Sequence, residues 1–144
     1  MVLLSMLYRL QFFNRERSYL KQIGSVGSSP LQFYFPYGVA VDKNDRIIVS
    51  EHGNDRVQVL SRDGDFSSLF GKEGKGNGEF NSPDVDDDGN IYVADYRNQG
   101  VQKLDRDGKF VSVIGRGKGN GDGQLNRPWD VAVNGDALCL LLIE

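Results

Sequence analysis

Four carboxylates follow one another at the spacing of a calcium-binding EF-hand loop, namely Asp84, Asp86, Asp88 and Asp95. Such a loop needs a helix on each side, whereas residues 91–95 (IYVAD) alternate apolar and other side chains like a β-strand. The Asp88-Gly89 pair is also a common turn between two strands. We therefore predict a hairpin at 84–95 and no bound calcium.

No group of residues has the composition of a catalytic or metal site. The single histidine, His52, belongs to no motif that would pair it with a serine and an acid, as a hydrolase needs. One histidine and one cysteine, Cys139, are too few for a zinc site, and an internal disulfide is excluded. We predict that the chain is not an enzyme and holds no metal or cofactor.

Two glycine-rich segments, 71–80 (GKEGKGNGEF) and 115–125 (GRGKGNGDGQL), are the next candidates for chemistry. Neither has the Ser or Thr that follows the lysine of a phosphate-binding loop, so no nucleotide is expected as a ligand. Glycines also let a chain cross from one structural unit to the next. Phe80 and Leu125, each placed shortly before a proline, are expected to fill the space between such units.

The chain repeats itself. The sequence at 36–71 returns in altered form at 83–115, and Gly24, Gly71 and Gly115 mark a period of about 45 residues. Repeats of this length are typical of propellers and solenoids, in which each unit stacks on its neighbours.

Within one repeat the apolar residues alternate with a period of two, as in β-strands. Asn44-Asp45 and Asp63-Gly64 separate the apolar runs and favour tight hairpin turns. The repeat is therefore predicted to form four short antiparallel strands, at about 37–42, 46–50, 56–61 and 65–70, which is the content of one propeller blade.

These features together resemble a known family. Residues 36–80 resemble the NHL repeat in the order and spacing of their residues, which read PYGVAVDKNDRIIVSEHGNDRVQVLSRDGDFSSLFG and then GKGNGEF. PWDVAVN at 128–134 strengthens the resemblance, which covers roughly residues 9–136 and is greatest to the tripartite-motif (TRIM) NHL proteins. The resemblance implies blades of a six-bladed β-propeller.

The length of the chain allows only part of such a ring. We expect a non-repeat start at 1–8, the last two strands of a blade at 9–24, complete blades at 25–71 and 72–115, and the start of a further blade at 116–144. The fold class is thus an all-β, open, partial propeller, and the remaining blades are expected outside this chain.

The second blade has a shorter beginning than the first. Fewer residues separate Pro83 from Ile91 than separate Pro36 from Ile47. Aligned on the prolines, the loss falls on Gly-Val-Ala of the innermost strand and predicts a shortened first strand in that blade.

Candidates for ligand contact are the residues that differ between repeats and the basic residues on or near the glycine-rich segments that connect two blades, which we call the joints. In a propeller the joints between blades and the loops after the second strands share one face. The expected ligand-binding face consists of Tyr37, His52, Arg56, Lys72, Lys75, Tyr96, Arg97, Arg116, Lys118, Arg127 and Trp129. Aromatic rings beside cations can stack single-stranded bases and hold phosphates. For Tyr37 and Trp129, taken singly, packing between blades is the favoured role and ligand contact is the alternative.

The resemblance implies a non-catalytic module that recognises protein or RNA, in the setting of a TRIM-type ubiquitin ligase whose RING domain lies outside this chain. The alternative is a stand-alone protein-interaction scaffold with no RNA binding and no link to a ligase. A net charge of −3 argues against strong non-specific binding of nucleic acid over the whole surface. The apolar runs are too short to span a bilayer, so we expect no membrane partner and a cytoplasmic location.

Overall fold

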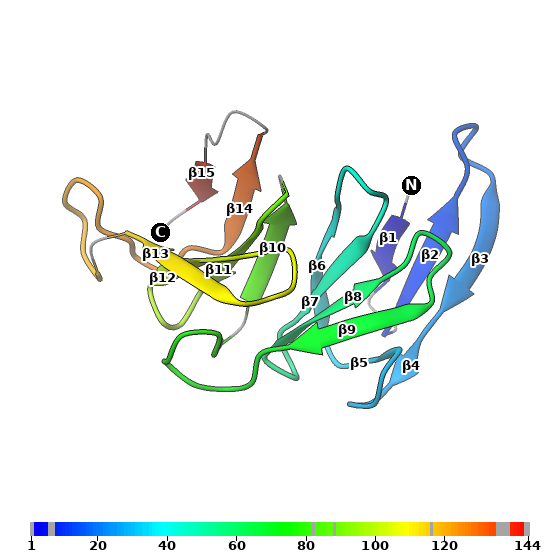
Figure 1. The fold of residues 1–144 in the computed structure, drawn as a ribbon, viewed down its shortest axis with the longest axis horizontal. Helices are drawn as coiled ribbons and strands as arrows, with labels where there is room; N and C mark the ends of the chain where they lie inside the picture. Colours follow the sequence, from blue (N-terminus) through cyan, green and yellow to red (C-terminus); the bar gives the residue numbers. More distant parts are fainter. Residues whose placement is uncertain are drawn as a thin grey trace.

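The structure is a computed structural model that describes residues 2–5, 8–81, 83–87, 89–115, 117–134 and 139–142. Within these residues the chain forms strands, turns and loops and contains no helix, which confirms the all-β prediction. Figure 1 shows the sheets side by side in sequence order, from the N-terminal sheet on the right to the C-terminal pair on the left.

Two complete four-stranded antiparallel sheets occupy the middle of the chain. The first contains β6 (Pro36–Val41), β7 (Ile47–Glu51), β8 (Arg56–Leu60) and β9 (Phe66–Phe70), and the second contains β10 (Pro83–Asp87), β11 (Ile91–Asp95), β12 (Gly100–Leu104) and β13 (Phe110–Ile114). The strands of the first sheet agree closely with the predicted ranges. The predicted turns fix them, because Asp45 (φ 61°) and Gly64 (φ 86°) take the left-handed backbone conformation.

The two ends of the chain form smaller sheets. At the N-terminal end β1 (Val2–Ser5), β2 (Arg9–Phe13) and β3 (Tyr19–Ile23) pair in that order, followed by the short parallel pair β4 (Ser25–Val26) and β5 (Gln32–Phe33). At the C-terminal end β14 (Asp130–Val133) pairs with β15 (Cys139–Leu142). By repeat spacing β2 and β3 correspond to β8 and β9, while β14 and β15 correspond to β6 and β7.

The core lies between consecutive sheets. The first strands of successive blades lie next to one another, β6 beside β10 and β10 beside β14 (Figure 1). Every residue of β7, β8 and β11 is buried, whereas the fourth strands β9 and β13 alternate between half-buried and exposed residues. In the first blade the second and third strands are buried and the first and fourth are partly exposed, as expected for sheets stacked face to face, and the all-β arrangement confirms the expected partial propeller.

The joints between blades are closed by one large apolar side chain each. Phe33 and Phe80 are 0% exposed and Leu125 is 6% exposed, so Phe80 and Leu125 fill inter-blade space as predicted. Each side chain lies against the glycine that marks the repeat: a Cβ added at Gly71 would come within 2.6 Å of the Phe80 ring. The recurring glycine is therefore required by a close approach as well as by its φ of 94°.

The innermost strand of the second blade is one residue shorter than that of the first, whereas the aligned loss comprises three residues. The strand β10 has 5 residues against 6 in β6 and pairs with β11 without interruption from Pro83↔Asp95 to Asp87↔Ile91. The first blade instead has a register shift between Pro36 and Val39, which is absent from the second. Compared with the first blade, the second blade lacks this bulge and has a shorter hairpin loop between its first two strands. The hydrogen-bonded ladder between these two strands is therefore retained.

Candidate ligand-binding face

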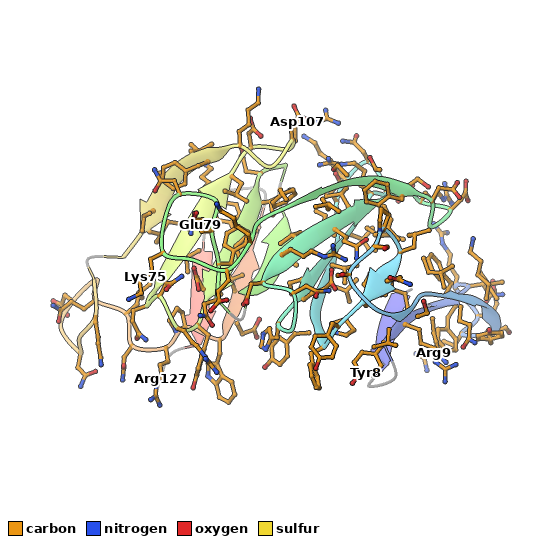
Figure 2. All side chains as sticks on the ribbon, turned by 90° about the horizontal axis from the view of Figure 1, so that it is seen from below. Tyr8, Arg9, Lys75, Glu79, Asp107 and Arg127 are labelled. Carbon is orange, nitrogen blue, oxygen red and sulfur yellow. The ribbon has the colours of Figure 1, made fainter. Side chains whose placement is uncertain are left out.

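The loops that follow the second strands and the joints that precede the first strands meet at one end of the sheets, which we call the loop face. His52 N donates to Phe35 O (2.9 Å), and Arg97 N donates to Asn81 O (3.3 Å) in the next blade. Figure 2 shows Tyr8 and Arg127 along the lower edge, on the loop face, with Asp107 at the opposite edge. The expected grouping of these loops on one face is therefore present.

A buried carboxylate holds the first of these loops in place. Glu51 is 0% exposed, and its Oε1 accepts hydrogen bonds from Tyr34 N (3.0 Å) and Asn54 Nδ2 (2.6 Å). Its Oε2 accepts from Arg56 Nε (2.7 Å) and Gln58 Nε2 (2.9 Å). Asn54 has a structural role, because its side chain links this carboxylate to the joint through Gly27 O (3.0 Å).

Arg56, expected on the ligand-binding face, is placed inside the blade. The residue is only 7% exposed, and its guanidinium forms an ion pair with Glu51 at 2.7 Å. The remaining guanidinium donors bind three backbone carbonyls of the preceding joint, those of Ser28, Ser29 and Gln32. These contacts hold the loop and the joint in place from inside the blade, and the side chain offers no surface to a ligand.

The second blade has the same arrangement without the cation. Asp95 is 1% exposed and accepts hydrogen bonds from Asn81 N (2.9 Å) and Asn98 Nδ2 (2.7 Å). Asn98 Nδ2 also donates to Gly74 O (2.6 Å), as Asn54 does to its joint. Glycine, Gly100, stands at the position of Arg56. Burial without a cation raises the pKa of the Asp95 carboxyl to about 6, while the hydrogen bonds from Asn98 and Asn81 oppose this rise.

The raised pKa of Asp95 predicts that stability falls as the pH rises. The folded protein holds a proton on this carboxyl up to about pH 6, whereas the ordinary pKa is 3.8, so the folded state binds more protons between these values. We expect the free energy of unfolding to be largest near pH 4 in this window, and the contribution of Asp95 to decline by at most about 3 kcal/mol towards pH 7. Urea denaturation at a series of pH values measures this slope.

Gly100→Arg should restore the missing cation and reduce this slope. A Cβ at Gly100 would meet only Val113 Cγ1 at 3.7 Å, an ordinary contact. At pH 7 the variant should gain about 1–2 kcal/mol, the size of a charge-assisted hydrogen bond. Gly100→Met is the control, because it adds a side chain of comparable length without charge. An unchanged pH slope in Gly100→Arg would contradict the assignment of the slope to Asp95.

Several aromatic rings are exposed on the loop face of the first blade. Tyr37 is 46% exposed and stacks on His52, with ring centroids 4.0 Å apart and planes at 17°. Beside the same loop, the rings of Tyr8, Tyr34 and Phe35 form a second group with centroid distances of 4.8–5.9 Å. Because Tyr37 is exposed to this extent, it is not buried between blades, which was one of the two roles expected for it. We call these five residues the aromatic group.

Three members of the aromatic group, Tyr8, Tyr34 and Phe35, were missed by the sequence analysis. They have no aromatic counterpart in the second repeat, where Asn81 stands in place of Tyr34. A signal was nevertheless present, because Tyr34 and Phe35 directly precede the proline that opens a blade, next to the joint. The contact with Tyr8 follows only from the fold, since it joins residues far apart in the sequence.

The residues before Pro36 and Pro128 adopt a left-handed backbone conformation. Phe35 and Arg127 both have φ of 47°, which costs a non-glycine residue roughly 1–2 kcal/mol. Both residues are exposed, Phe35 to 55%. The joint thus presents a different side chain at this position, Phe35 before the first complete blade and Arg127 before the last strand pair.

A second aromatic and basic pair lies at the start of the third blade. The guanidinium carbon of Arg127 is 5.9 Å from the centroid of the Tyr96 ring, and Arg127 N donates to Gln99 Oε1 (2.6 Å). Trp129, two residues further on, is 47% exposed. The structure therefore brings Tyr96 and Arg127 together from different blades, and Trp129 follows on the same strand-opening segment.

The remaining predicted cations are more scattered. Lys72 is exposed but forms an ion pair with Glu79 at 3.1 Å, and Figure 2 shows Lys75 further from the lower edge than Arg127. Arg97 and Lys118 are exposed, on the loop after β11 and on the last joint. Arg116 lies outside the described residues. In the part of the chain that the structure describes, these cations lie on two joints and on the loop after β11.

Comparison with known proteins places the first complete blade in a family. Residues 33–60 match the family model of the NHL repeat. The chain carries an NHL repeat. It is 40% identical over 45 residues to the protein lin-41 of Caenorhabditis elegans and 35% identical over 65 residues to the protein brain tumor of Drosophila melanogaster. The chain spans only 4% and 6% of the lengths of these two relatives.

Solved structures extend the likeness in fold to nearly the whole chain. A streptogramin B lyase superimposes with a TM-score of 0.57 at 14% identity, covering 99% of this chain and 53% of the lyase chain. A catalytically inactive virginiamycin B lyase from Staphylococcus aureus, solved with quinupristin, gives 0.55 at 14% identity and covers 96% and 49%. At this identity the likeness shows the propeller fold alone, and the chain spans about half of each solved propeller.

The acidic segment of the second complete blade is a β-hairpin, as predicted. The backbone of β10 pairs with β11 on either side of the connection, in place of the helices of a calcium loop. Asp88 lies outside the described residues. The Asp95 carboxylate, which would be the last calcium ligand, is bound instead by Asn81 and Asn98. In the part of the chain that the structure describes, no group of His, Cys, Asp and Glu has metal-site geometry, and no helix is long and apolar enough to cross a membrane.

Proposed function

We propose that the chain is a non-catalytic NHL binding module whose loop face binds single-stranded RNA. The NHL repeat and the relatedness to lin-41 and brain tumor support a binding module. The observation that carries the RNA proposal is the exposure of two rings, Tyr37 at 46% and Trp129 at 47%, together with the Arg127–Tyr96 pair. Exposed rings stack bases of any sequence, and nearby arginines neutralise phosphates.

The same resemblance to TRIM-NHL proteins supports a place for this module in a cytoplasmic RING-type ubiquitin ligase. In such a protein the loop face would select the RNA-bound or protein target, and the transfer of ubiquitin would depend on domains outside this chain. Identification of the full transcript and a ubiquitin-transfer assay of its product test this part of the proposal independently of RNA binding.

A protein partner is the second candidate for the loop face. It is favoured by the mutual contacts of Tyr8, Tyr34 and Phe35, because packed aromatic groups of this kind act as anchors in protein interfaces. It is also favoured by the net charge of −3, which weakens non-specific attraction to RNA. In this case RNA binding would be negligible at every salt concentration.

Removing Trp129 or Arg127 should weaken RNA binding. Fluorescence anisotropy with a mixed-sequence single-stranded RNA should show a loss of about 1–3 kcal/mol in Trp129→Ala if a base stacks there. Arg127→Ala should reduce the slope of log affinity against log salt by about 0.7 for one lost phosphate contact.

Matched controls lie away from the loop face. Arg106→Ala removes an exposed arginine next to Asp107, at the opposite edge of the sheets, and Tyr19→Ala removes a 55% exposed ring from an outer strand. Neither should alter affinity for RNA. Equal losses in the controls and in the loop-face variants would reject the loop face as the RNA site.

A further inference from the structure

The joints before the two complete blades are tied to their sheets by matching hydrogen bonds. In each blade the glutamine of the third strand, Gln58 or Gln102, donates from Nε2 to a joint carbonyl at 2.7 Å. Its Oε1 accepts from a joint backbone N, at 3.0 Å in the first blade and 2.8 Å in the second. The joint partners are Gln32 and Leu31 in the first blade and Glu79 and Gly78 in the second. Each joint is therefore held at nearly the same distance from its third strand.

One member of this network differs between the two blades. In the first blade the Arg56 guanidinium bonds to the buried Glu51 and to three joint carbonyls, those of Ser28, Ser29 and Gln32. By repeat spacing these carbonyls correspond to those of Lys75, Gly76 and Glu79. Glycine, Gly100, stands at the position of Arg56 and has no side chain that could reach them. The second blade thus has the acceptors that bind a guanidinium in the first blade, without the guanidinium.

These acceptors can be reached from solvent. Lys75 and Gly76 are exposed and Gly100 is half-buried, whereas Arg56 is only 7% exposed. A Cβ built at Gly100 would meet a single atom within 4 Å, at the ordinary contact distance of 3.7 Å, so the path of an arginine stem is open at its start. Gly76 O meanwhile accepts only a long hydrogen bond (3.3 Å) from Gln102, which leaves it able to accept a better donor.

The carboxylate beneath these acceptors has no cation. Asp95, the counterpart of Glu51, is 1% exposed, and no ion pair among the described residues includes it. Its hydrogen-bond donors are neutral, namely the backbone N of Asn81 and the side chain of Asn98. Burial raises the pKa of the Asp95 carboxyl to about 6, so at pH 7 most molecules carry it ionised. A cation bound nearby would offset the cost of this buried charge.

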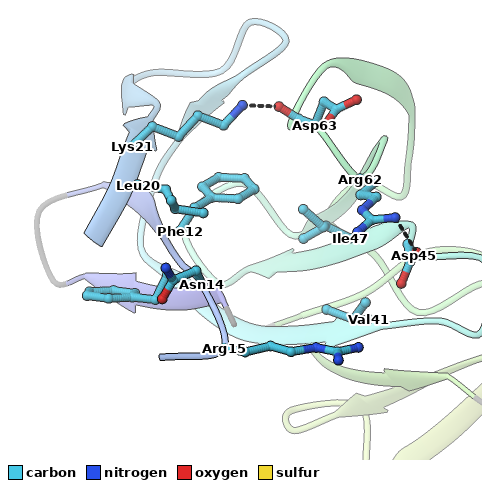
Figure 3. Close-up of a pocket in the computed structure, with 11 residues that line it drawn as sticks. Phe12, Asn14, Arg15, Leu20, Lys21, Val41, Asp45, Ile47, Arg62 and Asp63 are labelled. Carbon is cyan, nitrogen blue, oxygen red and sulfur yellow. Dashed lines mark hydrogen bonds and ion pairs between the residues drawn. The ribbon is translucent and has the colours of Figure 1, made fainter. Parts of the chain in front are cut away.

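An exposed carboxylate of the same chain shows the contrast. Arg62 lines a groove of about 510 Å³ and pairs with Asp45 at 3.3 Å, with 78% and 58% of the two side chains exposed (Figure 3). Water screens such a pair, so Asp45 would have little affinity for a free cation if Arg62 were removed. Asp95 differs because the surrounding protein excludes the water that would screen its charge.

We propose that the second blade binds a guanidinium group from outside the chain, between the carbonyls of Lys75 and Gly76 and the carboxylate of Asp95. A guanidinium fits these acceptors because it is planar, carries a permanent charge and has several N–H donors in a fixed fork. An arginine side chain of a partner protein and free arginine both carry this group, so a peptide and the free amino acid have to be compared. Binding at this site requires no RNA.

An NMR titration of the full chain with methylguanidinium at pH 7 tests the site. The backbone amide signals of Gly76 and Gly100 and the side-chain amide signals of Asn98 should shift and reach saturation at millimolar concentration. Urea, which has planar N–H donors without the charge, should produce no saturable shift. Gly100→Arg supplies its own guanidinium, so methylguanidinium should bind this variant at least about tenfold more weakly.

The exposed pair of Figure 3 gives the control variant. In Arg62→Ala the signals of Asp45 should shift in proportion to concentration, without saturation. A peptide with one arginine that binds at least about tenfold more tightly than free arginine would identify a partner protein as the source, and the reverse order would identify a small ligand. Shifts in the wild-type chain that never saturate overturn the proposal, whether or not the variants fold. Equal binding to the wild type and to Gly100→Arg, or equal saturation at Asp45 in Arg62→Ala, would also overturn it.

Discussion

Replacing Arg56 with methionine should lower the free energy of unfolding by about 3–5 kcal/mol, a large part of the stability of a domain of this size. The substitution keeps an apolar stem of comparable length, but it leaves the carboxylate of Glu51, which is 0% exposed, without its ion pair at 2.7 Å. It also leaves three joint carbonyls without their donor. Urea denaturation at pH 7, followed by circular dichroism, measures the loss.

Two further variants separate charge from packing in this prediction. Arg106→Met removes an exposed arginine and should change the free energy of unfolding by no more than about 0.5 kcal/mol. Glu51→Gln, added to Arg56→Met, removes the unpaired charge and should recover part of the loss. A loss in Arg56→Met no larger than in Arg106→Met would show that the buried ion pair does not hold the loop face.

The strand pattern could be predicted from the sequence because it depends on local signals. The alternation of apolar residues and the turn residues predicted the bounds of β6 to β9 closely. The glycine-rich segments predicted that Phe80 and Leu125 are buried between blades. The first strand of the second blade is shorter by only one residue, because residues lost between repeats need not all come from a strand. A ladder with a bulge can lose the bulge and keep its register, which an alignment on Pro36 and Pro83 does not reveal.

Arg56 shows why variation between repeats is an ambiguous sign of ligand contact. It was assigned to the binding face because glycine, Gly100, replaces it in the next repeat. The structure shows a different reason: a buried Glu51 is matched by a cation, whereas the shorter Asp95 is bound by backbone and amide groups only. The difference between repeats lies inside the blade, and sequence alone cannot distinguish it from a difference on the surface.

The aromatic group could be predicted only in part. Tyr37 and His52 stood out as varying positions beside the same joint, and the structure stacks them at 4.0 Å. Their neighbours Tyr34 and Phe35 depend on Tyr8, which lies before the first repeat match and reaches them through the fold. Contacts between segments that do not repeat leave no periodic signal.

Phe80→Ala should also cost about 3–5 kcal/mol, because it removes a fully buried ring and opens a cavity between two blades. The ring packs with Ile48, Val59 and Ile91 in the central cluster of the core, so both complete blades would lose contacts. Urea denaturation would measure the loss. An effect below about 1 kcal/mol would mean that the joint collapses onto the space and that the ring is not the main contact between blades.

The contact between Phe80 and the repeat-marking glycine makes a sharper test. Gly71→Ala must accommodate a φ of 94° and a Cβ 2.6 Å from the ring, so it should destabilise more than Gly78→Ala, whose φ of 76° is equally left-handed but whose Cβ would meet nothing within 4 Å. Combining Gly71→Ala with Phe80→Ala removes the clash, so the double variant should be more stable than the sum of the single losses by roughly 0.5–3 kcal/mol. The same combination with Gly78→Ala should be additive. Additivity in both cycles would show that glycine recurs at this position for its backbone conformation alone. A coupling found only at Gly71 would show that the contact with the ring is a second reason why glycine recurs there.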